Sequence, residues 1–212
     1  MTEDVFRSPK KRGRIAVFLS GRGSNFMAIH EAIRSGGINA DIALVFSNRK
    51  AAPGYLFAQE QGLETLYLRS KNFPDRESYD QEIAKEIQAR DIDLIVLAGY
   101  MRIITSSFCQ QFINRIINIH PALLPAFPGL HVQQQAIDWG ARFSGATVHF
   151  VVPEVDMGPI IVQAAVPVLQ DDTEETLSSR ILQEEHRLYP EAVKLYFEGR
   201  LEVRGRRVFI LE

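Results

Sequence analysis

An apolar segment, a glycine-rich loop and a helical segment follow one another near the start of this sequence. Residues 14–19 have the pattern of a strand, the next six residues contain two glycines, and residues 26–35 have the pattern of a helix. This order is typical of a sheet whose parallel strands alternate with helices on both faces. Residues 93–98 add a nearly continuous apolar run, as in central parallel strands. The sequence therefore predicts an α/β fold with a doubly wound, mostly parallel central sheet and a Rossmann-like N-terminal half.

The remaining segments continue this alternation of strands and helices. Further strands are expected over residues 42–46 and 64–68, around Asn118, and over 147–152 and 160–168. Further helices are expected over residues 54–61, 76–90, 106–112, 132–139 and 174–197. An apolar alternation over 201–211 predicts an edge hairpin, and the polar residues 1–13 are expected to form a solvated leader. One folded domain is expected over residues 14–212.

Bulk composition excludes several classes of protein. The chain has 24 Lys and Arg against 26 Asp and Glu, so no global positive field indicates a nucleic-acid partner. The single cysteine, Cys109, excludes an internal disulfide and fits a reducing compartment. No apolar run approaches the roughly 20 residues of a membrane helix, and the N-terminus lacks a secretory signal pattern. We expect a cytoplasmic protein without membrane contact.

The segment from Ile116 to Gly129 contains the first candidate catalytic residues. Asn118 and His120 alternate with isoleucines, so in a strand both polar side chains project from one face. Three prolines follow within eight residues of His120 and stiffen the next loop. An amide and an imidazole held in this way suit oxyanion stabilisation and proton transfer. A turn-capping asparagine and a core histidine are the structural alternative.

The glycine loop predicts an anion site rather than a dinucleotide site. Gly23, Ser24 and Asn25 supply backbone donors, a hydroxyl and a helix N-terminus, although a plain capped turn remains open. The third glycine of the dinucleotide fingerprint is replaced by Phe26. The acidic residue expected after the second strand is also missing, which argues against a nicotinamide-dependent oxidoreductase.

From Asn118 to His131 the sequence closely resembles the central motif of the folate-dependent formyltransferases, and the similarity runs from about Arg14 to about Glu202. The resemblance implies the formyltransferase fold, with a phosphate-binding half at 14–112 and a catalytic, folate-binding half at 113–212. It implies transfer of a formyl group from 10-formyltetrahydrofolate, the co-substrate, to the primary amine of glycinamide ribonucleotide in purine synthesis. We expect no metal, because nothing has the spacing of a metal site. A cis bond at Leu124–Pro125 is expected because the loop turns sharply while presenting His120, and the resemblance implies the same bond.

The resemblance also assigns roles to individual residues. It implies catalytic roles for Asn118, His120 and Asp156, with the Asp156 carboxylate beside the His120 imidazole. His149 is expected to be a satisfied strand histidine facing the same region. The residues implied to hold the acceptor substrate are Gly23, Ser24 and Asn25 at the ribose phosphate and Glu185 near the glycinamide end. Those implied to bind folate are Arg76, Met101, Arg102, Ile103, Ile104, Asn118, Val152 and Asp156.

Without the resemblance, several of these residues have plainer interpretations. Asp156 would be a turn cap, and Glu185 would belong to the solvated face of a helix. Arg76 would be a surface arginine, and Met101 and Ile104 would fill the core behind an ordinary loop.

Two other functions are weighed against glycinamide ribonucleotide formylation. A methionyl-tRNA formyltransferase shares the catalytic strand and folate pocket but resembles a longer chain with a tRNA-binding domain, for which we expect no room after Glu212. A non-catalytic nucleotide-binding module would need the glycine loop without Asn118, His120 and Asp156 together. We therefore expect small-molecule substrates, no nucleic acid, and either a monomer or a homodimer.

Overall fold

The computed structural model describes residues 12–212, so the predicted leader lies almost wholly outside the described residues. The strands are β1 (Gly13–Leu19), β2 (Ala40–Ser47), β3 (Thr65–Tyr67), β4 (Leu94–Leu97), β5 (Ile116–His120), β6 (Phe143–Phe150), β7 (Ile160–Pro167), β8 (Leu201–Arg204) and β9 (Arg207–Ile210). The helices are α1 (Ser24–Arg34), α2 (Pro53–Glu60), α3 (Arg76–Ala89), α4 (Ser106–Gln111), α5 (Val132–Asp138) and α6 (Glu174–Phe197), with a 3₁₀ turn, η1, at Ser70–Asn72.

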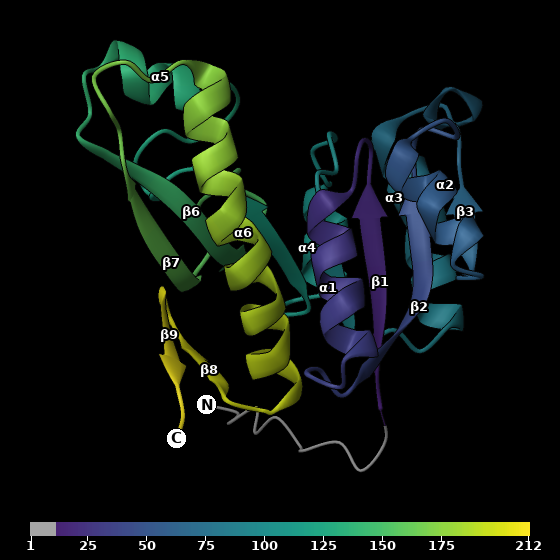
Figure 1. Ribbon diagram of the computed structural model, residues 1–212. Coiled ribbons are helices and arrows are strands. Elements are labelled where there is room, and N and C mark those ends of the chain that lie inside the picture. Colours follow the sequence, from purple (N-terminus) through teal and green to yellow (C-terminus); the bar gives the residue numbers. More distant parts are fainter. Residues whose placement is uncertain (1–11) are drawn as a thin grey trace.

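All nine of these strands form one sheet in the order β3-β2-β1-β4-β5-β6-β7-β9-β8 (Figure 1). Neighbouring strands from β3 to β5 pair in parallel, whereas β6 is antiparallel to both β5 and β7. β9 pairs in parallel with β7, and β8 closes the edge as the antiparallel arm of the predicted hairpin. The predicted mostly parallel sheet is confirmed.

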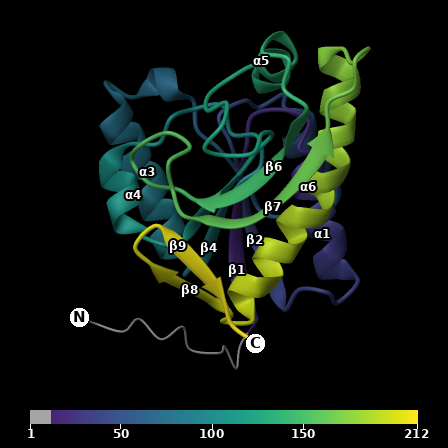
Figure 2. The same ribbon diagram turned by 90° about the vertical axis from the view of Figure 1, so that its left-hand side faces the viewer.

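Helices cover both faces of this sheet, with α1 and α6 on one side and α3 and α4 on the other (Figure 2). Strand residues alternate between the two cores: Val17 packs on the α1 and α6 side, and Phe18 packs with Tyr79 on the α3 side. The β6 to β9 part of the sheet is covered by the long helix α6 (Figure 2). No helix within residues 12–212 is long and apolar enough to cross a membrane.

Helix α6 is fixed to the strands that carry the site. Its Tyr189 is fully buried, and the hydroxyl lies 3.0 Å from the carbonyl oxygens of both Leu97 in β4 and Ile117 in β5. A capping box at Thr173 begins the helix. The hydrogen bonds of Tyr189 set the face of α6 that also carries Glu185 against the middle of the sheet.

The cis bond expected at Leu124–Pro125 is confirmed.

β6 begins at Phe143, four residues before the expected start at 147. The sequence Ser144-Gly145 resembles a loop, but Gly145 pairs with Ala164 in β7, and a Cβ there would lie 2.0 Å from the Ala164 carbonyl oxygen. Glycine therefore permits a close approach between strands rather than a turn.

Candidate active site

β5 places Asn118 and His120 on the same face of the sheet, as the alternation with isoleucines predicts. The isoleucines that flank Asn118 pack into the core on the α6 side, so the polar side chains project from the opposite face. In the antiparallel pairing with β6, Asn118 lies opposite His149 and His120 lies opposite Thr147. The polar side chains of β5 and β6 therefore lie next to one another across the strand pair.

The imidazole of His149 is buried and satisfied on both nitrogens. Nδ1 donates to the carbonyl oxygen of Phe150 at 2.9 Å, which leaves Nε2 to accept from the side-chain amide of Asn118 at 3.3 Å. Burial lowers the pKa of His149 and so favours the neutral ring that this pattern requires. His149 is a satisfied strand histidine that faces Asn118.

The imidazole of His120 is held between a loop carbonyl and a carboxylate. Nε2 donates to the carbonyl oxygen of Phe127 in the proline loop at 2.8 Å. Nδ1 lies 3.4 Å from Oδ2 of Asp156. With one hydrogen committed to Phe127, Nδ1 carries a hydrogen towards Asp156 only when the ring is charged.

Asp156 joins two loops rather than capping its own turn. Its Oδ2 accepts from the backbone N–H of Gly129 at 2.9 Å, and its Oδ1 lies 3.8 Å from Nε2 of His149. The backbone of Asp156 has a φ of 55°, a left-handed conformation that aspartate and asparagine adopt more readily than most residues. The local turn-cap interpretation therefore fails, and the carboxylate lies beside His120 as the resemblance implies.

The glycine loop ends in the first turn of α1. Gly23 is the N-cap, with a φ of 75°, and Ser24 is the first helical residue. A Cβ on Gly23 would lie 3.0 Å from the Cα of Gly54, so the loop packs tightly against the start of α2. The first N–H groups of a helix have no acceptor within the helix, so this turn offers donors to an anion.

Asn25 connects this turn to α6. Its side-chain amide donates to Oε2 of Glu185 at 2.7 Å, while its Oδ1 is buried without a partner within residues 12–212. Glu185 is 7% exposed, and burial raises its pKa, although the hydrogen bond from Asn25 opposes the shift. The interpretation of Glu185 as part of a solvated helix face is wrong, because α6 packs beside α1 and against β6 and β7.

The segment 101–104 follows β4 and is only partly buried. Met101 and Ile103 are 65% and 57% exposed, whereas Ile104 packs into the α3-side core. The core-filling interpretation therefore holds for Ile104 and is wrong for Met101. The Met101 N–H donates to the Ser20 hydroxyl just after β1, and this bond connects the segment 101–104 to the glycine loop.

The remaining residues implied to bind folate are Arg102, Arg76 and Val152, which come from three different segments. The guanidinium of Arg102 lies over the ring of Tyr79, 4.8 Å from its centre. Arg76 is the exposed first residue of α3, and Val152 is half-buried just after β6. Arg76 and Arg102 follow the parallel strands β3 and β4, at the edge of the sheet where open α/β folds bind ligands. Val152 follows the antiparallel strand β6 and lies near the start of β5.

A pocket of about 270 Å³ lies beside the catalytic candidates. Its lining residues are Leu124, Pro125, Asp156, Met157, Gly158, Ile160 and Arg206. No group of three or more His, Cys, Asp or Glu side chains within residues 12–212 is arranged to hold a metal ion.

Comparison with known proteins identifies the family. Residues 13–193 match the family described as formyl transferase, which includes every implied site residue from Gly23 to Glu185. The chain belongs to the formyl transferase family. The resemblance seen in the sequence is thus confirmed, together with its fold.

Individual formyl transferases are similar over most of the chain. It is 41% identical to the phosphoribosylglycinamide formyltransferase of Escherichia coli strain K12, over 89% of each protein. The crystal structure of glycinamide ribonucleotide transformylase 1 from Symbiobacterium toebii matches with a TM-score of 0.94 and 49% identity, over 96% of each chain. The trifunctional purine biosynthetic protein adenosine-3 of Drosophila melanogaster is 46% identical over 90% of this chain, but the match spans only 14% of that longer protein.

One supporting residue of this formyl transferase site was missed in the sequence. The buried Thr147 hydroxyl donates to the carbonyl of Ala122 at 2.7 Å and accepts from the Leu124 N–H at 3.1 Å. Gln163 of β7 donates to the same oxygen and to the carbonyl of Leu124. These contacts brace the proline loop that carries Phe127. Only the strand register brings Thr147 beside His120, and one threonine in a strand gives no sequence signal of that kind.

Proposed function

We propose that this chain transfers the formyl group of 10-formyltetrahydrofolate to the primary amine of glycinamide ribonucleotide, giving formylglycinamide ribonucleotide and tetrahydrofolate. The observation that carries the proposal is the joint placement of Asn118, His120 and Asp156. Asp156 Oδ2 lies 3.4 Å from the His120 ring, and the Asn118 amide faces the same region from the same strand. A nucleotide-binding module would need no such arrangement.

The reaction begins with attack of the neutral amine on the formyl carbon, which creates a tetrahedral oxyanion. Asn118 has two amide hydrogens, and His149 accepts one of them. The second is then available to the oxyanion. The charged His120 ring supplies another donor from Nδ1, because the 3.4 Å separation from Asp156 is longer than a charge-assisted hydrogen bond.

Collapse of the intermediate breaks the bond between the formyl carbon and the folate nitrogen N10. One proton must leave the attacking amine, and one must reach N10, so the reaction is balanced without another reactant. Asp156, whose Oδ2 lies 3.4 Å from Nδ1 of His120, orients the imidazole and assists the proton's movement through water. These steps require neither a metal ion nor a covalent enzyme intermediate.

The acceptor substrate is proposed to lie along the α1 and α6 side of the cleft. Gly23, Ser24 and Asn25 bind its phosphate at the first turn of α1. Glu185, held by Asn25, faces the glycinamide end. The unpartnered Oδ1 of Asn25 is a buried acceptor that a substrate hydroxyl or amide would satisfy.

Folate is proposed to bind on the α3 side of the sheet, against residues 101–104 and Val152. Arg76 and Arg102 then face the glutamate end of the cofactor, where cations match carboxylates. The formyl transferase family uses formyltetrahydrofolate as co-substrate. We further propose cytoplasmic activity on these small molecules alone, without nucleic acid.

An acceptor comparison tests the proposal. Tetrahydrofolate release from 10-formyltetrahydrofolate is followed by absorbance with glycinamide ribonucleotide, with its dephosphorylated form and with methionyl-tRNA. We expect rapid release only with the ribonucleotide. Formylation of methionyl-tRNA would support the rival enzyme, and no release with any acceptor would support a binding module.

A further inference from the structure

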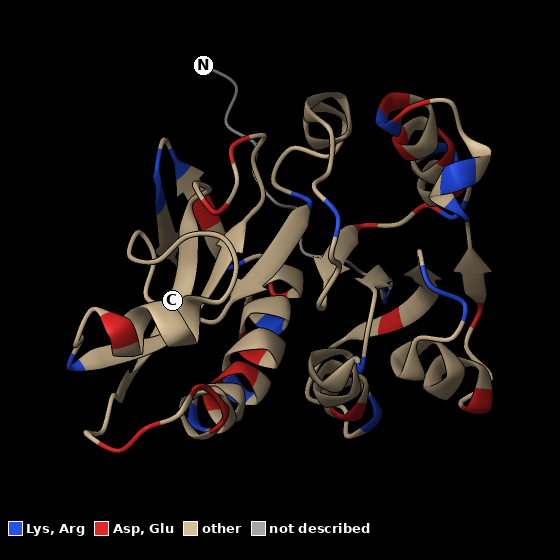
Figure 3. Ribbon diagram, turned by 90° about the horizontal axis from the view of Figure 1, so that it is seen from above, with Lys and Arg blue, Asp and Glu red and all other residues tan. Residues whose placement is uncertain are grey.

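Ser20 lies just after β1, between the two halves of the proposed site. In the sheet, β1 lies between β2 and β4, and the loops after β1 and β4 lead to α1 and α4 on opposite faces. Ligands of open α/β sheets bind in the crevice where two such loops separate. Figure 3 looks down on this edge of the sheet. Ser20 therefore lies where the acceptor side of the site adjoins the folate side.

The side chain of Ser20 connects three loops. Its hydroxyl accepts from the Met101 N–H, after β4, at 2.9 Å and donates to Oδ1 of Asn48, after β2, at 2.7 Å. The backbone N–H of Ser20 also donates to the carbonyl oxygen of Gly99 at 3.0 Å. Ser20 is 2% exposed, so water is excluded from these bonds. Because its hydrogen is committed to Asn48, the hydroxyl presents a fixed lone pair to Met101.

The segment 101–104, proposed to bind folate, has few other attachments. Among its N–H groups, only that of Met101 has a hydrogen-bond acceptor in the part of the chain that the structure describes. Met101 itself is 65% exposed. At the other end, the N–H of Thr105 donates to the buried carboxylate of Asp80 at 2.8 Å. The segment is thus held mainly at its two ends, and Ser20 holds the end nearer the glycine loop.

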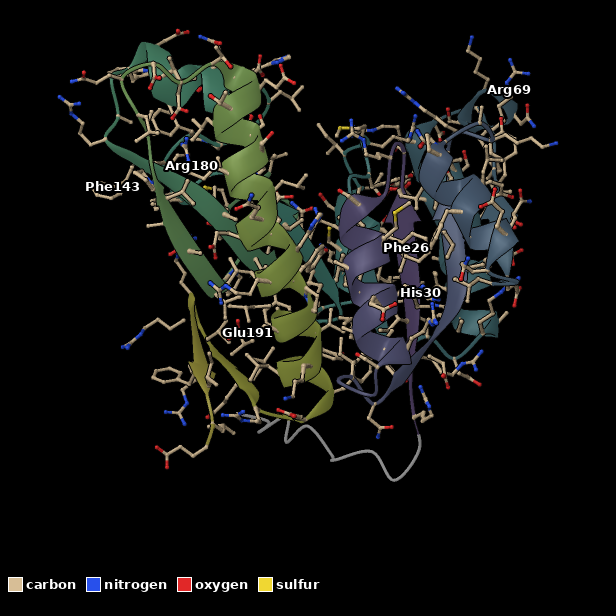
Figure 4. The ribbon with its side chains drawn as sticks, in the orientation of Figure 1. Phe26, His30, Arg69, Phe143, Arg180 and Glu191 are labelled. Atoms are coloured by element: carbon tan, nitrogen blue, oxygen red, sulfur yellow. The ribbon has the colours of Figure 1, made fainter. Side chains whose placement is uncertain are left out.

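Ser20 also begins the glycine loop, residues 21–25, where the phosphate is proposed to bind. This loop is short and tightly packed: the carbonyl oxygen of Gly21 accepts from the N–H of Gly54 at 3.1 Å. Phe26, labelled in Figure 4, follows the loop in the first turn of α1. A ligand that fixes this loop therefore also fixes the position of Ser20.

Two ligands that order the same element assist one another. The first ligand to bind loses part of its affinity to the ordering, and the second meets an element that is already ordered. A phosphate at the glycine loop orders Ser20 from one side, and folate at the segment 101–104 orders its hydrogen bond with Met101 from the other. Any such coupling is reciprocal.

We propose that Ser20 is a positioning residue that couples the two substrates, so that phosphate bound at the glycine loop strengthens the binding of folate at the segment 101–104. The inference rests on the proposed function. A neutral hydrogen bond of ordinary strength corresponds to about a fivefold change in an equilibrium constant, so we expect coupling of about fivefold.

The test measures the affinity for tetrahydrofolate, which has no formyl group and so forms a complex with glycinamide ribonucleotide without reaction. Its dissociation constant is measured by calorimetry, alone and with saturating ribonucleotide. In the parent the ribonucleotide should raise the affinity about fivefold, and in Ser20→Ala less than about twofold. The control Ser35→Ala removes an exposed hydroxyl that bonds to Ala32 at the far end of α1, and it should keep the full rise.

Two further comparisons separate coupling from stability and from direct contact between the substrates. Asn48→Ala changes a half-buried loop residue and frees the Ser20 hydroxyl to turn, so the rise should be intermediate. Inorganic phosphate, compared with chloride at equal ionic strength, occupies the loop without touching folate. It should raise the affinity for tetrahydrofolate in the parent and not in Ser20→Ala.

A full rise in Ser20→Ala, or no rise in the parent, would overturn the inference. A rise with the ribonucleotide but none with inorganic phosphate would also overturn it, because the coupling would then come from contact between the substrates. Should Ser20→Ala fail to fold, the full rise in Asn48→Ala would overturn it. Coupling in a parent protein that transfers no formyl group would contradict the proposed function alone, and formyl transfer without coupling would overturn the inference alone.

Discussion

The side-chain amide of Asn118 donates to Nε2 of His149 across the pairing of β5 and β6, at 3.3 Å. His149 can accept this bond because its own N–H is held by the carbonyl of Phe150, and because burial lowers its pKa and keeps the ring neutral. The histidine therefore fixes which way the amide of Asn118 is turned, so that its nitrogen rather than its oxygen faces the site.

Replacing that acceptor should impair turnover more than binding. His149→Phe keeps a buried ring but removes Nε2, so the amide of Asn118 loses its fixed orientation. A neutral hydrogen bond is worth about 1 kcal/mol, so we expect kcat to fall about fivefold. KM for both substrates should change by less than about twofold, because the lost interaction belongs to the transition state. Steady-state kinetics check this, and an unchanged kcat would show that Asn118 needs no such support.

Asp156→Asn isolates the charge of the carboxylate. Asparagine also tolerates the left-handed backbone at this position and still accepts from Gly129, so the two loops stay joined. We expect kcat to fall by about 10²–10⁴-fold, the usual contribution of acid–base assistance. Substrate KM should change much less.

Thermal unfolding of the same variant separates catalysis from architecture. The control is Asp171→Asn, which removes the charge of an exposed loop aspartate. A less stable Asp156→Asn protein that turns over at close to the parent rate would make the carboxylate structural. His120 would then lack the partner that the mechanism requires.

Removing the phosphate from the acceptor should weaken its binding. The first turn of α1 offers several donors, and hydrogen bonds to a charged group contribute about 1.5–3 kcal/mol each. KM for the glycinamide ribonucleoside should therefore rise by orders of magnitude. Comparable kcat/KM for the ribonucleotide and the ribonucleoside would place the phosphate elsewhere.

Glu185 predicts a pH dependence of stability. Its pKa is raised by burial, so the folded state binds more protons than the unfolded state between the normal value of 4.5 and the raised value. The free energy of unfolding contributed by Glu185 is thus largest below pH 4.5 and decreases as pH rises through the raised pKa. Glu185→Gln keeps an acceptor for Asn25 without this titration.

We expect Glu185→Gln to be more stable than the parent at neutral pH, with a difference that shrinks towards pH 4.5, and to bind the acceptor substrate less well. Urea unfolding across this range gives the comparison. Parallel curves for the two proteins at every pH would mean that Glu185 does not titrate differently on folding.

Much of the fold was predictable because it depends on local patterns. Apolar runs and helical periodicity located the strands and helices, and the cis bond at Leu124–Pro125 followed from the proline loop and the family resemblance. The start of β6 was predicted too late, because Gly145 serves the close approach of β7, and a sequence does not show which strand will lie beside a glycine.

The site was predictable only in part, since its partners come from distant segments. The alternation in β5 predicted that Asn118 and His120 share a face, but the residues alone did not place Asp156 beside them. Burial of Glu185 depends on α6 packing beside α1 and against β6 and β7, which helical periodicity did not reveal. Thr147 became visible only through the register of β5 and β6.

Tracing the formyl carbon tests the central claim most directly. The protein is incubated with 10-formyltetrahydrofolate labelled with ¹³C in the formyl group and with glycinamide ribonucleotide, and the products are analysed by mass spectrometry. The account predicts that the label appears in formylglycinamide ribonucleotide, with one tetrahydrofolate released for each labelled product, and that His120→Ala abolishes nearly all of it. Label recovered as free formate at the same rate with or without the ribonucleotide would contradict it.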